Sequence, residues 1–577
     1  MRICECHSIR GEFDADAHSR CYENTTKQES VRMNDRTLYA KIISPENLRR
    51  AFVYASAERQ KDHFYDPLEI KWYRAHEQEL ISELHETLQD PGNYEQESSF
   101  AYFPPKNRVC YRRMVFIPMR DLVVRYAFVS VIADQLDGRL SDRCFSNRRA
   151  KGDRAKYFLL EDYARGPWQN FVDWQKSAAS NHKFMLKTDI SSFYDSVSHK
   201  YLEDVLRSEL KLPQNSKVVS LFQKILKVNI ESYSHLDNSI QQPARLHQGL
   251  PIGNNTEGFL ANLYLMEIDR KMAKAGVEFG RYTDDMRMYA KDIATLRKAI
   301  MILQESLLKL GLNLNSSKTK LGGNPKELEE MRSKDNEIYG YLDPVELEKE
   351  NQLLPLADKG FRDQPKLFTE KTGFEDEDDA AKFCKYISWL VSPGKKPFTK
   401  VNKLRVWHVE RLGEIIRRYA GAGKHASWLL VMATFYDDVP QTVSNRAFQM
   451  ITELLTDKQV NTYSRYRLTH FIISKGSFRF HNSMWIDFFP DETKEWLKKV
   501  CVSFLKEPAI ELNLVAIHAF KVLGLSFDEI KTLVETHSIQ PLASPAQNAL
   551  NWLEDQTTQE EAEHIDLTFV DEDVDYI

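Results

Sequence analysis

Residues 279–289 read Phe-Gly-Arg-Tyr-Thr-Asp-Asp-Met-Arg-Met-Tyr. Apolar and polar residues alternate on either side of Thr283, Asp284 and Asp285, which predicts a β-hairpin with a tight turn at these three residues. Such a hairpin carries two neighbouring carboxylates at one edge of a sheet. Aspartate is also common in turns for conformational reasons alone, so the pair by itself leaves a purely structural interpretation open.

A third aspartate follows another short apolar run. Phe184, Met185 and Leu186 lead through a lysine and a threonine to Asp189, which predicts a buried strand with a carboxylate at its end. Mg²⁺ prefers carboxylate oxygens and keeps several waters, so two or three converging aspartates are enough to bind it. Two such ions about 4 Å apart can join a nucleotide to a primer hydroxyl. The three aspartates therefore predict a site for two Mg²⁺ ions.

Further motifs surround these aspartates in a fixed order. Residues 281–285 resemble the Tyr-x-Asp-Asp box of reverse transcriptases, and the other boxes of that family occur in the expected sequence. They are the runs at 113–121, 145–148, 189–195, 248–253 with 260–265, and 311–319. The resemblance covers roughly residues 40–340. It implies an α+β right-hand polymerase with fingers and palm, and a DNA polymerase activity that is RNA-directed or template-independent.

The resemblance also implies catalytic and metal-binding roles. Asp189 and Asp284 would bind both Mg²⁺ ions, the carbonyl of Ile190 would assist, and Asp285 would support them. Lys318 would donate a proton to the departing pyrophosphate, although a solvated lysine is the alternative. No protein nucleophile is needed, because the primer hydroxyl itself attacks.

Five further residues would bind the incoming dNTP. Tyr194, five residues after Asp189, would act as a steric gate against a ribose 2′-hydroxyl, unless it is simply a core aromatic. Gln248 and Gly249 would lie against the nascent base pair, where glycine lets the backbone come close. Arg113 and Arg120 would contact the triphosphate, because guanidinium groups fit phosphate oxygens.

Charge and composition are compatible with a nucleic-acid partner. The net charge is −5, but residues 554–577 contain ten acidic residues and no Lys or Arg, and removing them leaves a net charge of +5. A basic cleft is therefore plausible. Within it, Lys106, Arg148 and Tyr282 are predicted to contact RNA or DNA. The acidic tail is either a solubilising end or a mimic of nucleic acid that guards the cleft.

The chain divides into five predicted parts. They are a flexible leader (1–32), fingers (33–178), a palm (179–344), an α-helical C-terminal domain that is thumb-like or solenoid-like (345–553), and a disordered acidic tail (554–577). Apolar residues make up 42% of the chain, enough for real cores, yet no apolar run is long enough to predict a membrane span. Scattered cysteines and the lack of a signal peptide favour the cytoplasm.

Departures from the best-known relatives narrow the lineage. Residues 250–253, Leu-Pro-Ile-Gly, together with a long helical C-terminal region, resemble abortive-infection and other anti-phage defence reverse transcriptases. Such an enzyme would copy a structured non-coding RNA, or would extend DNA from a protein hydroxyl without a template. Analogy with helical-repeat defence enzymes also leads us to expect a homo-oligomer. A catalytically silent nucleic-acid-binding module acting through the helical half is the alternative.

One pattern in the helical half suggests a second chemistry. Arg465 and His470 have the spacing of certain helical ribonucleases used in defence. Six-residue matches of this kind are common by chance, so we interpret His470 as a structural histidine.

Overall fold

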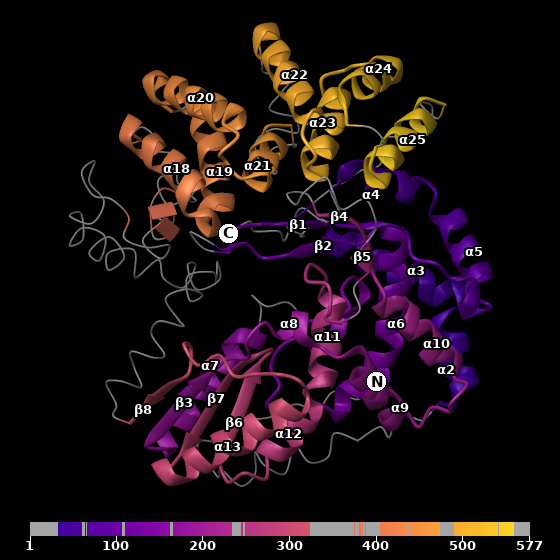
Figure 1. Cartoon of the computed structure of the whole chain (residues 1–577), viewed down its shortest axis with the longest axis vertical. Helices are drawn as coiled ribbons and strands as arrows, with labels where there is room; N and C mark the ends of the chain where they lie inside the picture. Colours follow the sequence, from indigo (N-terminus) through magenta and orange to yellow (C-terminus); the bar gives the residue numbers. More distant parts are fainter. Residues whose placement is uncertain are drawn as a thin grey trace, which may run out of the picture.

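The computed structural model describes residues 33–59, 64, 66–106, 110–161, 166–233, 244–245, 248–323, 374, 380–381, 383–384, 387, 404–435, 439–473, 490–539 and 542–558. The predicted leader and the acidic tail beyond residue 558 lie outside these residues. The described part of the chain contains two four-stranded sheets, a set of N-terminal helices and a helical C-terminal region (Figure 1).

The N-terminal part is a set of helices around one central helix. α6 (Met119–Leu136) is buried along almost its whole length, so apolar residues occupy all of its faces. The helices before it are α2 (Asp35–Ile42), α3 (Pro45–Arg59), α4 (Pro67–Ala75) and α5 (Glu77–Thr87). The Ser44 hydroxyl accepts a hydrogen bond from the backbone amide of Asn47 at 3.2 Å, which caps the start of α3.

The first sheet has the strand order β2-β1-β4-β5. Its strands are β1 (Ser99–Tyr102), β2 (Met114–Phe116), β4 (Asn229–Tyr233) and β5 (Ala244–Arg245). Side chains from β1 and β2 alternate between two hydrophobic clusters, because successive residues of a strand point to opposite faces. Ala101 and Val115 pack among the N-terminal helices, whereas Phe100, Tyr102, Met114 and Phe116 pack against the helical C-terminal region.

The second sheet carries the predicted hairpin. Its strands are β3 (Phe184–Thr188), β6 (Glu278–Tyr282), β7 (Asp285–Ala290) and β8 (Lys320–Gly322), in the order β6-β7-β3-β8, and all pairs are antiparallel. Tyr282 pairs with Asp285, so β6 and β7 are joined by the two-residue turn Thr283-Asp284. The structure thus confirms both the hairpin and the buried strand before Asp189.

Helices cover both faces of the second sheet. α13 (Ile293–Lys309) packs on one face through apolar residues spaced three and four apart, and α12 (Met266–Met272) lies beside it. α7 (Pro167–Asn181) packs on the other face, and it spans the predicted boundary between the fingers and the palm.

The remaining described elements before the helical C-terminal region are α8 (Phe193–Ser196), α9 (His199–Leu210), α10 (Lys217–Leu226), α11 (Asn255–Tyr264), η1 (Pro91–Asn93), η2 (Asp137–Arg139) and η3 (Gly152–Lys156).

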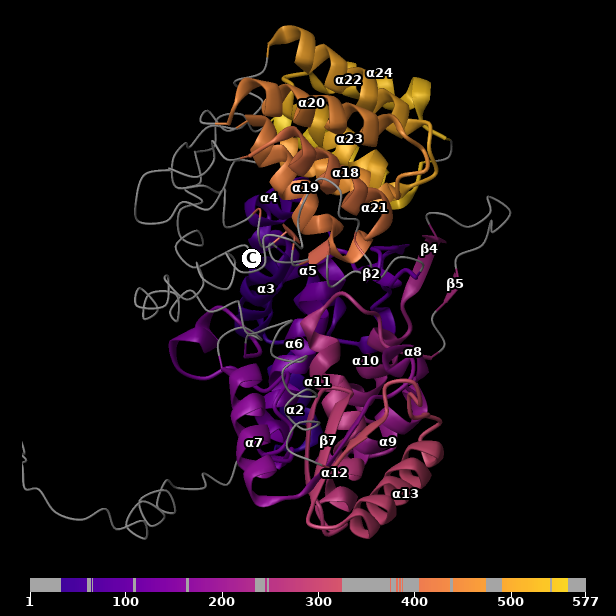
Figure 2. The same cartoon turned by 90° about the vertical axis from the view of Figure 1, so that its left-hand side faces the viewer.

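The helical C-terminal region stands over the first sheet (Figures 1 and 2). Its helices are α18 (Val406–Arg418), α19 (Ala420–Phe435), α20 (Gln441–Thr456), α21 (Thr462–Ile473), α22 (Asp491–Leu505), α23 (Ile510–Val522), α24 (Phe527–His537) and α25 (Ser544–Thr558). α19, α21, α23 and α25 contact one another in that order and form an inner row. This arrangement confirms that the region is helical, as predicted.

Aromatic contacts join this region to the N-terminal part. Phe64 stacks on Tyr466 of α21, with ring centroids 4.7 Å apart. The indole nitrogen of Trp72 on α4 donates a hydrogen bond to Asp555 of α25 at 2.8 Å. The predicted start of the disordered tail at residue 554 is therefore wrong, because α25 continues to Thr558 and this contact holds its last turn.

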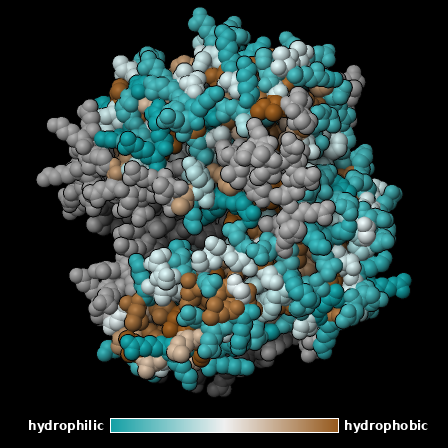
Figure 3. Space-filling model, in the orientation of Figure 1, coloured by the Kyte–Doolittle hydropathy of each residue, from teal (hydrophilic) through white to brown (hydrophobic). Residues whose placement is uncertain are grey.

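The surface of the described residues is mostly hydrophilic on the face drawn in Figure 3, with apolar side chains gathered over the end of the second sheet. Exposed residues of the elements there include Leu321 on β8 and Met301 and Leu308 on α13. Within the described ranges, every helix is too short or too polar to cross a bilayer.

Candidate active site

Two carboxylates face each other at one end of the second sheet. Asp189 follows the last residue of β3, and Asp284 lies in the turn between β6 and β7. The pairing of Thr188 with Met286 brings both to the same edge. Burial, and next the negative charge of Asp189, raise the pKa of Asp284 to about 7. The sequence prediction that these two residues converge is thus confirmed by the structure.

Lys318 lies against this pair. Its Nζ is 2.8 Å from Oδ2 of Asp189. The chain reaches this position because the backbone amide of Asn315 donates to the carbonyl of Asp189 at 2.8 Å, beside a bridge between Ile190 and Leu314. Burial lowers the pKa of Lys318, but its hydrogen bond to Asp189 and the surrounding carboxylates outweigh burial and raise it. The ammonium is therefore protonated and supplies a cation where the site has an excess of negative charge.

Asp285 is held differently from its neighbour. Both of its carboxylate oxygens accept hydrogen bonds from Arg287, at 2.6 and 3.0 Å, and the Arg287 side chain is fully buried. Arg287 therefore already balances the charge of Asp285, whereas Asp284 interacts with the like charge of Asp189. Among the residues that the structure describes, no group of three or more His, Cys, Asp or Glu side chains forms a metal site. Asp189 and Asp284 both offer carboxylate oxygens, the ligand type that Mg²⁺ prefers.

The turn that presents Asp284 has an unusual backbone. Thr283 has a φ of +55°. This is the first central position of a two-residue hairpin turn, which glycine usually occupies when φ is positive. A β-branched residue there costs on the order of 1–3 kcal/mol and persists only where its surroundings enforce it. The surroundings here include Arg281, which is fully buried and pairs with both carboxylate oxygens of Asp269 at 2.8 and 2.9 Å.

Gly249 packs against the segment that follows Asp189. Its φ is +85°, and its amide donates to the carbonyl of Val197 at 2.8 Å. A Cβ at this position would lie 2.9 Å from the carbonyl oxygens of Tyr194 and Asp195. Glycine is therefore required by the protein's own backbone, a reason that the sequence did not reveal. Gln248, beside it, is exposed.

Tyr194 and Arg113 belong to the same neighbourhood. Burial, and next the charge of Asp284, raise the pKa of Tyr194, which places its phenol near the carboxylate pair. Arg113 forms an ion pair with Asp195, 2.7 Å from Nη2 to Oδ1. Arg120 differs, because its described ion pairs are with Glu83 and Asp121. Among the described contacts, the structure therefore brings Arg113, but not Arg120, to the Asp189–Asp195 segment.

The three predicted nucleic-acid contacts have different surroundings. The Arg148 guanidinium donates to Asp137 at 2.9 Å and to nearby backbone carbonyls, so it fixes a loop. Tyr282 packs edge-to-face on Trp168, with ring centroids 5.1 Å apart. Lys106 is exposed, and its backbone amide donates to the carbonyl of Cys110.

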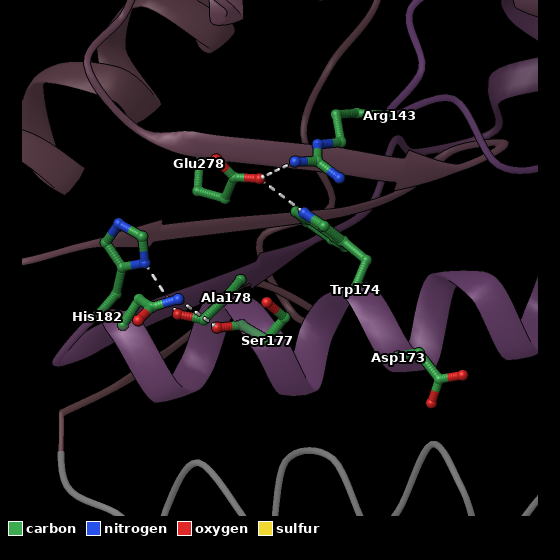
Figure 4. Close-up of a pocket in the computed structure, with 8 residues that line it drawn as sticks. Arg143, Asp173, Trp174, Ser177, Ala178, His182 and Glu278 are labelled. Carbon is green, nitrogen blue, oxygen red and sulfur yellow. Dashed lines mark hydrogen bonds and ion pairs between the residues drawn. The ribbon is translucent and has the colours of Figure 1, made fainter. Parts of the chain in front are cut away.

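A pocket of about 450 Å³ lies at the opposite end of β6 from Asp284 (Figure 4). Glu278 accepts a hydrogen bond from the Trp174 indole at 2.8 Å and pairs with Arg143 at 2.8 Å. Glu278 and Arg143 thus satisfy each other, and the length of β6 separates the pocket from Asp284. It is lined by Arg143, Asp173, Trp174, Ser177, Ala178, Asn181, His182 and Glu278.

Residues 157–337 match the family described as Reverse transcriptase (RNA-dependent DNA polymerase). This segment is similar to a reverse transcriptase domain. The matched segment includes Asp189, Asp284, Asp285 and Lys318, and the domain supports RNA-directed DNA polymerase activity. The predicted enzyme class, a nucleotidyltransferase, is thereby confirmed.

Other comparisons add little. No curated protein matches the chain. Among solved structures, the chain is similar to apo telomerase from Candida tropicalis truncated from its C-terminal domain, at 14% identity and a TM-score of 0.29. That match covers 40% of this chain and spans half the length of the telomerase chain. At this TM-score the likeness carries no conclusion about fold or activity.

Sequence reasoning assigned no role to several residues around the site. Ser146, Asn262 and Arg281 occur within the quoted motifs, and Asp269 and Arg287 lie close to them. Arg281 and Arg287 could have been suspected, because each falls at a position where strand alternation points the side chain into the protein and a buried arginine needs an acidic partner. The identity of that partner depends on tertiary contacts.

Proposed function

We propose that this reverse transcriptase adds dNTPs to a primer end by two-metal catalysis at the Asp189–Asp284 pair. The observation that carries the proposal is the approach of two carboxylates at one sheet edge, with the charge of Asp189 contributing to the raised pKa of Asp284. Structural ion pairs balance their charges, whereas this pair retains excess negative charge that suits a cationic ligand. The sheet that carries the pair would be the palm.

The donor set fits Mg²⁺, because carboxylate oxygens are its preferred protein ligands. Asp189 and Asp284 would hold the two ions, with the Ile190 carbonyl as a further oxygen. When bound, Mg²⁺ activates the primer hydroxyl and neutralises the charge on the triphosphate. Lys318, now on Asp189, would exchange that partner for the pyrophosphate and offset part of its negative charge. Asp285, neutralised by Arg287, would keep the turn rigid.

Substrate selection would involve the segment after Asp189. The Tyr194 side chain would lie beneath the sugar and exclude a 2′-hydroxyl, since its backbone is fixed by the amide of Leu250 at 2.7 Å. The triphosphate would compete with Asp195 for the Arg113 guanidinium, because phosphate oxygens bind arginine in the same bidentate manner as carboxylates. Arg120 would act on the triphosphate only after leaving Glu83.

We further propose a role in anti-phage defence. Its support is the Leu-Pro-Ile-Gly run at 250–253 and the long helical C-terminal region. The template would be a structured non-coding RNA, or synthesis would start from a protein hydroxyl without a template. The cytoplasm would be the site of action, and a homo-oligomer the active form.

The experiment uses the full chain purified with its bound nucleic acid. Each labelled dNTP and rNTP is supplied with Mg²⁺, and Asp284→Asn is compared with Asp173→Asn, which alters an exposed carboxylate on α7. Incorporation of dNTPs that only Asp284→Asn abolishes supports the proposal. Product that vanishes when co-purified RNA is digested beforehand indicates a bound template. Product that survives RNA digestion and stays attached to protein indicates protein priming. No incorporation under any condition favours the silent binding module.

A further inference from the structure

Two neighbouring residues from outside the hairpin hold its turn. The amide of Thr283 donates a hydrogen bond to Oγ of Ser146 at 2.7 Å, and the Thr283 hydroxyl donates to the same oxygen at 3.0 Å. The side-chain amide of Asn147 donates to Oγ1 of Thr283 at 3.3 Å. Ser146 is buried. Both the backbone and the side chain of the residue before Asp284 are therefore anchored to residues 146–147.

Helix α11 in turn holds residues 146–147. The side-chain amide of Asn262 donates to the carbonyl of Ser146 at 2.7 Å, and its Oδ1 accepts from Nη1 of Arg281 at 2.7 Å. One turn earlier on the same helix, a Cβ on Gly258 would lie only 2.4 Å from Cγ of Asn147. The helix thus fits closely against these two residues, and Asn262 links them to the hairpin.

Arg281 completes the support from within the hairpin. Its Nη1 donates to the carbonyl of Thr283 at 3.2 Å, while Asp269 orients its guanidinium. The backbone of Arg281 also bonds to the segment before Ser146, through the carbonyl of Arg143 at 2.9 Å and the amide of Phe145 at 3.1 Å. Residues 146–147 and Arg281 therefore hold Thr283 directly, and Asn262 of α11 joins the two. We call Ser146, Asn147, Asn262 and Arg281 the turn clamp.

We propose that Ser146 and Asn262 of the turn clamp are positioning residues that set the affinity of the Asp189–Asp284 pair for divalent cations. Neither side chain has a described contact with the two carboxylates. Both act on Thr283, directly or through Ser146, and Thr283 holds a backbone conformation that a threonine leaves when its support is removed. Relaxation of that residue turns the next side chain, Asp284, away from Asp189. The inference rests on the proposed role of the pair as the metal site.

The test measures metal binding without catalysis. Mn²⁺ is titrated into the purified full chain, and free Mn²⁺ is followed by electron paramagnetic resonance. Ser146→Ala removes a buried hydrogen-bond acceptor, so we expect its Kd for Mn²⁺ to rise about tenfold. Asn147 has a φ of +52°, so Asn147→Gly removes the 3.3 Å contact without backbone strain and is expected to raise the Kd less. Ser180→Ala, which alters an exposed serine on α7, is the matched control and is expected to bind as the wild type does.

A second substitution separates positioning from general destabilisation. Glycine adopts a positive φ without strain, so in the Thr283→Gly background the turn needs less support. There we expect Ser146→Ala to change the Kd by about twofold or less. A purely structural role for Ser146 predicts the same change in both backgrounds, and that result would overturn the proposal.

The outcomes for the clamp and for the proposed function are distinguishable. If wild type incorporates dNTPs but Ser146→Ala and Asn262→Ala bind Mn²⁺ as tightly as wild type does, the clamp proposal is overturned. The proposed function is unaffected by that result. If Ser146→Ala and Asn262→Ala bind Mn²⁺ more weakly than wild type but wild type incorporates no dNTPs, the clamp is supported and the proposed function is overturned. Wild type that binds no Mn²⁺ overturns both.

Discussion

The end of the second sheet and the middle of α21 both bury charged side chains, and both were marked by short sequence motifs. In α21, the guanidinium of Arg465 pairs with both oxygens of Glu507, at 2.8 and 2.5 Å. His470 is buried and stacks on Tyr466. At the end of the second sheet, by contrast, Asp284 lies near another carboxylate, that of Asp189.

The difference between these regions is the balance of charge. A buried ion pair with complementary partners needs nothing further, and its surroundings can be purely structural. Two carboxylates that approach each other at a strand end raise the free energy of the folded protein until a cation binds. Charge imbalance therefore distinguishes the carboxylate site from a structural ion pair, and substitutions in either region test that distinction.

Asp284→Asn removes the imbalance and is expected to cause the largest change. Incorporation of dNTPs should fall on the order of 10³-fold, because several kcal/mol of metal-assisted stabilisation is lost. The fold should be unharmed, since an uncharged side chain no longer opposes Asp189. Labelled-nucleotide incorporation and thermal unfolding measure the two effects. A variant that loses activity only in proportion to its loss of folded protein would contradict this prediction.

Arg465→Ala breaks the balanced pair in α21. We expect the free energy of unfolding to fall by about 3 kcal/mol, because Glu507 is left without its partner. Incorporation per folded molecule should stay at the wild-type level. Urea denaturation gives the free energy of unfolding. Incorporation is divided by the concentration of folded protein, which is measured without using activity. An RNA-cleaving activity that disappears in this variant would show that the α21 motif is functional after all.

Asp285→Asn tests the two neighbouring aspartates against each other. Arg287 neutralises Asp285, so we expect incorporation to fall only about tenfold, far less than in Asp284→Asn. The unfolding free energy should drop by about 1–3 kcal/mol, because a buried arginine loses its carboxylate partner. Equal losses of activity in the two variants would mean that Asp285 shares the metal-binding role.

The pH dependence of stability follows from the raised pKa of Asp284. Its pKa is about 7 in the folded protein and near 3.8 when unperturbed. Between these values the folded state binds the extra proton, so stability falls as pH rises from about 4 to about 7 and then levels off. In EDTA, wild type should therefore lose more stability than Asp284→Asn over this range. Melting temperatures of both proteins at several pH values check the slope, and parallel curves would contradict it.

Lys318→Met is expected to have the smallest effect. The ammonium partly offsets the excess negative charge, so its removal should further raise the pKa of Asp284, which the Lys318 charge now lowers. Incorporation at saturating Mg²⁺ should fall only a few-fold, within the range typical of an exposed ion pair. Rates measured across pH provide the check. A loss as large as that of Asp284→Asn would make Lys318 an essential proton donor.

Features that depend on local pattern were predictable from the sequence. Alternation around Thr283 located the hairpin, and the apolar run before Asp189 located β3. The order of the motifs then identified the carboxylates. Each of these signals arises from side-chain periodicity within one element, and the structure needs only to pack that element.

Features that depend on distant partners were not predictable. Arg120 has a guanidinium group, which is suited to phosphate, but Glu83 from another helix forms an ion pair with it. The approach of Gly249 to the Tyr194 backbone and the anchoring of α25 by Trp72 likewise join residues far apart in the sequence. Such pairings depend on how the elements pack, and a periodic pattern contains no information about them.

The aromatic face of the first sheet has a consequence for inheritance. Phe100 and Tyr102 lie in the hydrophobic cluster of the helical C-terminal region, while Ala101 between them lies in that of the N-terminal helices. A recombination event that exchanged the helical region alone would bring a foreign surface against these rings. The two halves of the gene are therefore expected to be inherited as a unit. A chimera of two relatives should fold only when β1, β2 and the helical C-terminal region come from the same parent.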